Sequence, residues 1–192
     1  MSIVPSLVAV VLAAGGSRRF GGDKRRHPIG GKPLLQRALA TPLSLGLPTI
    51  LVLKPEDQLC LDELLGPWLG NERLSIVYAE RAVEGMGHSL AAAATAAGRY
   101  DGLLVMLGDM PYVSGKTLRH LCDSFRHTGI SVPRYRGMHG HPVLFARRWF
   151  RELEALSGDS GARAILSEHP EAVSYIEVDD PGILRDVDHP PA

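Results

Sequence analysis

A loop rich in glycine and in fixed positive charge carries the clearest chemistry in this sequence. Residues 12–24 read Leu-Ala-Ala-Gly-Gly-Ser-Arg-Arg-Phe-Gly-Gly-Asp-Lys. Glycines allow successive backbone N–H groups to converge on an anion, and arginine and lysine neutralise the charge of a triphosphate. We therefore predict that this loop binds phosphate groups. The alternative interpretation is a flexible glycine turn with solvated arginines.

Two better-known phosphate loops do not fit this segment. Gly16 and Gly21 have the outer glycine spacing of a P-loop, but Gly22-Asp23 stands where that motif requires lysine followed by serine or threonine. The loop also lacks the Gly-x-Gly-x-x-Gly fingerprint of dinucleotide-binding proteins. The predicted phosphate loop is therefore neither a P-loop nor a dinucleotide-binding loop.

One aspartate is placed where a divalent cation could bind. Asp109 follows the apolar run of residues 103–107 in the sequence Gly-Asp-Met-Pro. Mg²⁺ prefers one or two carboxylates together with phosphate oxygens and water, which a single aspartate facing a triphosphate can supply. A turn or helix cap before Pro111 is the alternative role for this aspartate.

A second glycine segment, Gly85-Met86-Gly87-His88-Ser89, precedes an alanine-rich stretch. Glycines before a helix N-terminus let a ligand approach the backbone N–H groups closely. Ser89 could instead be an ordinary helix N-cap. His88 is either a surface histidine or a contact peculiar to this protein.

Histidines and arginines are interleaved with glycine in residues 133–143. His139 and His141 have the spacing of a metal-binding pair, but no third ligand is evident nearby, so we do not expect a transition metal.

These segments all follow predicted strands. Short apolar runs at residues 7–13, 49–53, 74–78 and 103–107 are typical of buried strands, and helical patterns occupy residues 33–45, 56–69, 89–97 and 117–127. Further strands at 130–132 and 142–146 and a helix at 149–156 give a mixed second half. This order predicts an α/β fold with a mostly parallel sheet between helical layers. In such a sheet, ligands bind beyond the carboxyl ends of the strands.

The composition is that of an ordinary globular protein. The 192 residues fit one domain, with 45% hydrophobic and 22% charged residues. Lys plus Arg and Asp plus Glu both number 21, so no overall field would gather nucleic acid or anionic lipid. No apolar run reaches the roughly 20 residues of a membrane span, and we expect a cytoplasmic protein with Cys60 and Cys122 as reduced structural thiols.

The loop of residues 12–24, followed by Gly30-Gly31-Lys32-Pro33-Leu34-Leu35, resembles the molybdenum-cofactor nucleotidyltransferases, and the cytidylyltransferases among them most closely. The resemblance implies a single Rossmann-like nucleotidyltransferase domain over residues 1–192. It implies magnesium-dependent transfer of CMP from CTP to a molybdopterin-type acceptor, with release of pyrophosphate. A molybdoenzyme apoprotein is a further implied partner. Phe20 departs from the usual methionine, which alters packing more than charge.

The same resemblance assigns roles to individual residues. Arg18, Lys24 and Asp109 would act in catalysis, and Gly140 and His141 would contact the acceptor. Asp188 would join Asp109 in holding Mg²⁺, with Asp186 as a possible substitute because His189 stands where the family has threonine. The residues assigned to nucleotide binding are Leu12, Ala13, Ala14, Gly15, Gly16, Ser17, Arg18, Lys24, Gly85, Met86 and Ser89.

Several alternatives remain open at this point. Ala14, where guanylyl-transferring relatives tend to have glycine, favours CTP over GTP. The acceptor could also be a sugar 1-phosphate or another small phosphate. A nucleotide-binding regulatory protein without turnover is the alternative outside enzymology.

Overall fold

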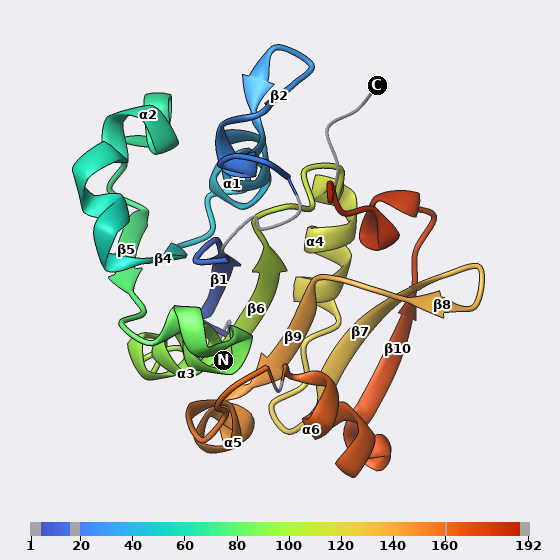
Figure 1. Ribbon diagram of the computed structural model, residues 1–192. Helices are drawn as coiled ribbons and strands as arrows, with labels where there is room; N and C mark the ends of the chain where they lie inside the picture. Colours follow the sequence, from blue (N-terminus) through green and yellow to red (C-terminus); the bar gives the residue numbers. More distant parts are fainter. Residues whose placement is uncertain (1–4, 16–19, 160, 189–192) are drawn as a thin grey trace.

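The fold is organised around an eight-stranded sheet, seen in a computed structural model that describes residues 5–15, 20–159 and 161–188 (Figure 1). Seven strands lie in the order β10-β7-β9-β6-β1-β4-β5, and β8 pairs with β7. Only β9 and β8 run antiparallel to their neighbours in this sheet. The strands are β1 (Leu7–Leu12), β4 (Thr49–Leu53), β5 (Leu74–Tyr78), β6 (Gly102–Leu107), β7 (Ile130–Tyr135), β8 (Met138–His139), β9 (Val143–Ala146) and β10 (Val173–Glu177).

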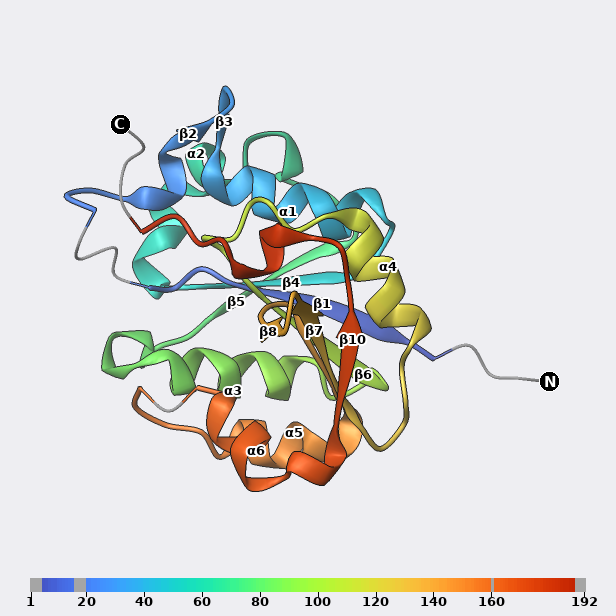
Figure 2. The ribbon, with the colours of Figure 1, turned by 90° about the vertical axis from the view of Figure 1, so that its right-hand side faces the viewer.

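The sheet is buried on both faces, as a parallel sheet of continuous apolar strands requires. In β1, Val8 and Val10 pack into one core while Ala9 and Val11 pack into the other. Figure 2 shows the two helical layers. One comprises α1 (Leu34–Ser44), α2 (Leu61–Leu65) and α4 (Gly115–Asp123), and the other α3 (Met86–Ala96), α5 (Phe150–Glu154) and α6 (Arg163–Glu168). The predicted α/β fold class is thereby confirmed.

A small hairpin precedes α1. Strands β2 (Pro28–Ile29) and β3 (Lys32–Pro33) pair antiparallel. The two residues between them, Gly30 and Gly31, have φ of 55° and 78°. A two-residue turn with positive φ at both positions favours glycine, so this Gly-Gly pair sets the hairpin geometry.

The prediction of one continuous helix over residues 56–69 is wrong. The chain there forms a 3₁₀ segment (Pro55–Cys60), the short α2 and a second 3₁₀ turn (Gly66–Trp68). Gly66 has φ of 50° and is followed by proline, so the α-helix cannot continue past Leu65.

Other predicted boundaries shift by a few residues. The helix predicted from 117 begins at Gly115 because Ser114 caps it, accepting a hydrogen bond from Thr117 N, and it ends at Asp123. The helix predicted at 149–156 is a 3₁₀ turn (Arg147–Trp149) followed by α5. Strand β10 was not predicted, because it lies at the sheet edge and its sequence Val-Ser-Tyr-Ile-Glu contains no continuous apolar run.

Both cysteines carry free thiols, and burial raises the pKa of Cys122 to about 11. No described helix combines the length and hydropathy that crossing a bilayer requires.

The segment after β10 is held against α4 by one buried carboxylate, Asp180. Its Oδ2 accepts hydrogen bonds from Thr117 Oγ1 at 2.6 Å and Ser114 N at 2.9 Å, and its Oδ1 accepts one from Gly182 N at 2.9 Å. Although burial by itself raises the pKa of Asp180, these donors outweigh it and lower the pKa overall.

We expect Asp180→Asn to lower the free energy of unfolding by about 1–3 kcal/mol at pH 7, because an amide nitrogen would face buried donors. The folded-state pKa lies below the ordinary value, so the carboxylate stabilises the fold above about pH 4 and loses this effect as pH falls further. Urea unfolding at pH 7, 5 and 3 measures both effects. The variant should lose less stability than the native protein between pH 5 and 3, and an equal loss would contradict the assignment.

Candidate active site

Three charged side chains from distant parts of the sequence meet beyond the carboxyl end of β6. Lys24 Nζ lies 2.7 Å from Asp109 Oδ2 and 3.4 Å from Asp188 Oδ1. Lys24 begins a 3₁₀ turn (Lys24–Arg26), Asp109 follows β6, and Asp188 lies near the C-terminus. Burial alone lowers the pKa of Lys24, but the two carboxylates raise it overall, so the amine stays charged.

Asp109 has a carboxylate oxygen suited to a metal ion. Its Oδ1 is buried and accepts no hydrogen bond from any residue that the structure describes. A buried carboxylate oxygen without a donor is costly unless a cation or water satisfies it. Asp188 supplies a second, half-exposed carboxylate beside the same lysine. The two carboxylates fit Mg²⁺, which takes its remaining ligands from phosphate and water.

The two aspartates are brought together by the returning C-terminal segment. Val187 N donates to Asp109 O at 3.0 Å, and Val187 is itself buried. Asp188 therefore follows directly on a residue that is hydrogen-bonded to the Asp109 backbone. Asp186 is exposed, and among the described carboxylates only Asp109 and Asp188 form an ion pair with Lys24.

The start of the phosphate loop is hydrogen-bonded to β4 on one side and to the residue after β6 on the other. Ala13 N donates to Val52 O, and Gly108 N donates to Leu12 O, both at 2.9 Å. The side chains of Leu12, Ala13 and Ala14 are buried in the two cores. These residues can therefore reach a nucleotide only through their backbone. Next to them, a Cβ added at Gly15 would lie within 4 Å of no described residue beyond its chain neighbours.

The centre of the loop lies outside the described residues. Gly16, Ser17 and Arg18 belong to the undescribed range 16–19, so their predicted contacts remain predictions. Of the loop's predicted cationic contacts, the structure places Lys24.

The segment before α3 adopts a conformation that only glycine can hold. Gly85 has φ of 136°, and a Cβ there would lie 2.1 Å from the carbonyl of Gly158. Gly87 N donates to Gly158 O at 2.8 Å, and Gly158 N donates to His88 Nε2 at 3.3 Å. His88 is thus a contact that joins the start of α3 to the loop after α5.

The alternative role of Ser89 as a helix N-cap is wrong. The N-cap of α3 is Gly85, and Ser89 lies within the helix with 5% of its surface exposed. Met86, the first residue of α3, is about half exposed and remains available to a ligand. The sequence signal misled because Ser89 precedes the alanine run, whereas the helix begins three residues earlier.

His141 lies on the Asp109 side of the predicted acceptor segment. Burial lowers the pKa of His141, although the charge of Asp109 acts in the opposite direction, so the ring is neutral near pH 7. Its Nδ1 is buried and has no hydrogen-bond partner among the described residues. Gly140 packs so closely that a Cβ would lie 2.0 Å from Ile183 O. His139 is exposed, its ring 6.0 Å from that of Tyr175.

No group of three potential metal ligands forms among the described His, Cys, Asp and Glu residues.

One residue of the site region was missed from the sequence. Arg25 is 6% exposed and forms a buried ion pair with Asp57, at 2.6 Å between Nη1 and Oδ2. Its partner follows β4 and is distant in sequence, so no local spacing could have indicated the pair.

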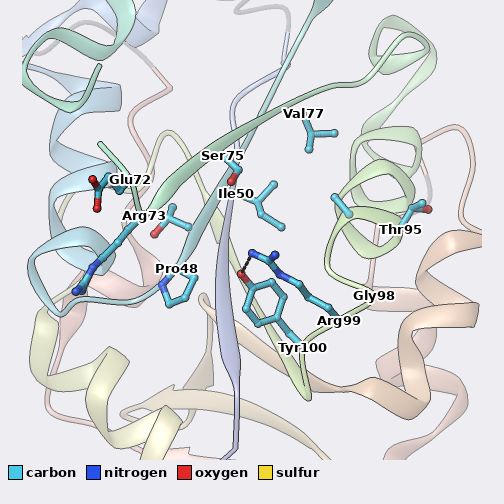
Figure 3. Close-up of a pocket in the computed structure, with 12 residues that line it drawn as sticks. Pro48, Ile50, Glu72, Arg73, Ser75, Val77, Thr95, Gly98, Arg99 and Tyr100 are labelled. Atoms are coloured by element: carbon cyan, nitrogen blue, oxygen red, sulfur yellow. Dashed lines mark hydrogen bonds between the residues drawn. The ribbon is translucent and has the colours of Figure 1, made fainter. Parts of the chain in front are cut away.

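A cavity of about 480 Å³ lies at the opposite end of the sheet, between the amino ends of β4 and β5 and the end of α3 (Figure 3). Arg99 extends into it and donates to the Tyr100 hydroxyl at 2.7 Å. Glu72 also lines the cavity. It contains none of the charged residues that meet at Asp109, and it takes no part in the site described above.

Comparison with known proteins is consistent with this geometry. The sequence model of the family described as "MobA-like NTP transferase domain" matches residues 9–173. Purine catabolism protein PucB of Bacillus subtilis is 31% identical over 97% of this chain and 93% of its own. Nicotine blue oxidoreductase of Paenarthrobacter nicotinovorans is 33% identical over 96% of this chain and 93% of its own.

A similar solved structure is that of Rv0371c from Mycobacterium tuberculosis H37Rv. It superposes with a TM-score of 0.79 at 33% identity, covering 95% of this chain and 93% of that one. A second structure of the same protein, a complex with manganese, superposes with a TM-score of 0.72 at 30% identity over 90% of this chain and 88% of that one.

Proposed function

Because this chain belongs to the MobA-like NTP transferase family and is a nucleotidyltransferase, we propose that it transfers CMP from CTP to a molybdopterin-type acceptor. The observation that carries the proposal is the buried Oδ1 of Asp109, which has no hydrogen-bond partner among the described residues and lies beside Lys24 and Asp188. In this proposal the carboxylate binds the metal and the amine binds phosphate at the end of the glycine loop. Both are needed where a triphosphate is cleaved.

The reaction needs no covalent enzyme intermediate. A phosphate oxygen of the acceptor attacks the α-phosphorus of CTP in line, the bond from the α-phosphorus to the bridging oxygen breaks, and pyrophosphate leaves. Lys24 and Arg18 bind phosphate oxygens and neutralise the charge that develops on them. Asp109 and Asp188 would hold Mg²⁺, which would screen the negative charge of the phosphates.

The other walls of the site have separate roles in this proposal. The backbone of Leu12, Ala13, Ala14 and Gly15 and the start of α3 at Gly85, Met86 and Ser89 bind the nucleotide. The acceptor is contacted by Gly140 and by His141, whose neutral ring can hydrogen-bond without adding charge.

CTP is preferred to GTP in this proposal because Ala14 stands where guanylyl-transferring relatives tend to have glycine. The whole chain, residues 1–192, acts as one domain in the cytoplasm. The product is passed to a molybdoenzyme apoprotein.

The test is pyrophosphate release by the purified protein with Mg²⁺ and molybdopterin, comparing CTP with GTP. A sugar 1-phosphate in place of molybdopterin is the acceptor control. We expect release with CTP that depends on molybdopterin and is at least tenfold slower with GTP.

Each other outcome contradicts a defined part of the proposal. Equal or faster release with GTP would contradict the assignment of CTP as the donor. Release with a sugar phosphate would contradict the assignment of molybdopterin as the acceptor. Nucleotide binding without release under any condition would identify a binding protein and contradict the enzymatic role.

A further inference from the structure

Arg25 is a buried cation that the reaction described above does not use. Its guanidinium donates two hydrogen bonds to Asp57, at 2.6 and 2.7 Å, and two to Asp23, both at 2.8 Å. A fifth goes to the backbone oxygen of Ala13 at 3.0 Å. These five bonds match the five N–H donors of an arginine side chain. Every donor of this buried side chain therefore has a partner.

The partners of Arg25 lie at both ends of the phosphate loop. Ala13 is the first residue after β1, where the loop begins, and Asp23 is near its end. Asp57 belongs to the 3₁₀ segment that follows β4, the strand next to β1. Asp57 is itself fixed, because its Oδ2 accepts a hydrogen bond from Lys54 N at 3.0 Å. Arg25 thus joins the two ends of the loop to each other and to a neighbouring strand.

Lys24 and Arg25 are consecutive in one 3₁₀ turn, so their side chains project about 120° apart. One side chain enters the interior while the other reaches the carboxylates of Asp109 and Asp188. Any shift of the Arg25 backbone would move Lys24 with it.

We infer that Arg25 is a positioning residue, which closes the phosphate loop and holds Lys24 against Asp109. This inference rests on the proposed function, since it assigns Arg25 to the same nucleotide site. Stability alone is a poor explanation of the contact, because apolar side chains often replace a buried ion pair at no cost in stability. The rigid planar fork of arginine fixes geometry in a way that neither lysine nor an apolar residue reproduces.

The test compares two double variants, each of which removes one of two neighbouring ion pairs. R25L/D57L replaces the buried pair by apolar side chains, and R26L/E63L removes the exposed pair of the next residue. We expect R25L/D57L to fold, with pyrophosphate release from CTP and molybdopterin reduced about 10- to 100-fold, as small displacements of catalytic groups cause. Amide hydrogen exchange in residues 20–24 should become faster. R26L/E63L should match the native protein in both measurements.

Arg25→Lys covers the case in which the double variant does not fold. It keeps the charge but cannot bind Asp57, Asp23 and Ala13 together, so turnover and loop exchange should fall between those of R25L/D57L and the native protein. Folded variants with native turnover and native loop exchange would overturn the inference. If the native protein releases no pyrophosphate, the proposed function fails, and loop exchange alone decides the role of Arg25.

Discussion

Asp109→Asn is expected to reduce pyrophosphate release at least 10²-fold while leaving the fold intact. The substitution removes the negative charge opposite Lys24 Nζ, 2.7 Å away, and puts a neutral amide in place of the carboxylate whose buried Oδ1 has no partner among the described residues. Loss of one preorganised charge at a phosphoryl site costs on the order of 10²–10³ in turnover. Turnover at saturating Mg²⁺ and thermal unfolding, measured on the same preparation, test this expectation.

Asp101→Asn is the matched control, since this aspartate lies at the opposite end of β6 and accepts a hydrogen bond from Ser6 N at 2.9 Å. It should keep native turnover. Titration of Mn²⁺ with CTP, followed by electron paramagnetic resonance, should show weaker binding only in Asp109→Asn. A folded Asp109→Asn protein with native turnover would remove this residue from the mechanism.

Lys24→Ala is expected to weaken CTP binding at least tenfold and to lower turnover about 10²-fold. The amine is the described cation nearest the metal-binding carboxylates, and its raised pKa keeps it charged throughout the physiological range. Without it, the triphosphate loses a counter-charge at the end of the glycine loop. Calorimetric titration with CTP and Mg²⁺ measures the affinity.

Asp109→Asn and Lys24→Ala should differ in their effect on the affinity for a metal ion measured without nucleotide. Removal of Lys24 leaves Asp109 and Asp188 without their shared cation, so Mn²⁺ without nucleotide should bind at least as tightly as in the native protein. Lys116→Ala, an exposed lysine on α4, is the control and should change neither affinity. Equal CTP affinity in the native protein and Lys24→Ala would exclude the lysine from phosphate binding.

Local sequence patterns predicted the strands around the active site better than the ends of the helices. The strands β1, β4, β5 and β6 could be predicted because a continuous apolar run can only be buried, and a parallel sheet buries it on both faces. The loops at their ends could then be located without a structure. Helix boundaries were less predictable, since Gly66 and Ser114 act through backbone conformation and capping that apolar spacing does not reveal.

The prediction that residues 12–24 form a phosphate loop came from composition. Composition did not reveal which atoms of these residues are available to a ligand. Leu12, Ala13 and Ala14 face the cores, so only their backbone is available. Ser89 illustrates the opposite error, because a serine before an apolar run has the local pattern of an N-cap. Gly85, with its positive φ, is the N-cap instead.

By itself the sequence determined most residue types of the site, since glycines, Lys24 and Asp109 follow predicted strands in patterns suited to phosphates and Mg²⁺. Asp188 was assigned only through the family resemblance. The tertiary structure alone decided which of them meet. Lys24 contacts Asp109 and Asp188 because the chain returns after β10 and Val187 bonds to the Asp109 backbone. The Arg25–Asp57 pair depends likewise on the adjacency of β1 and β4. Such contacts arise from strand order and burial, which no local spacing encodes.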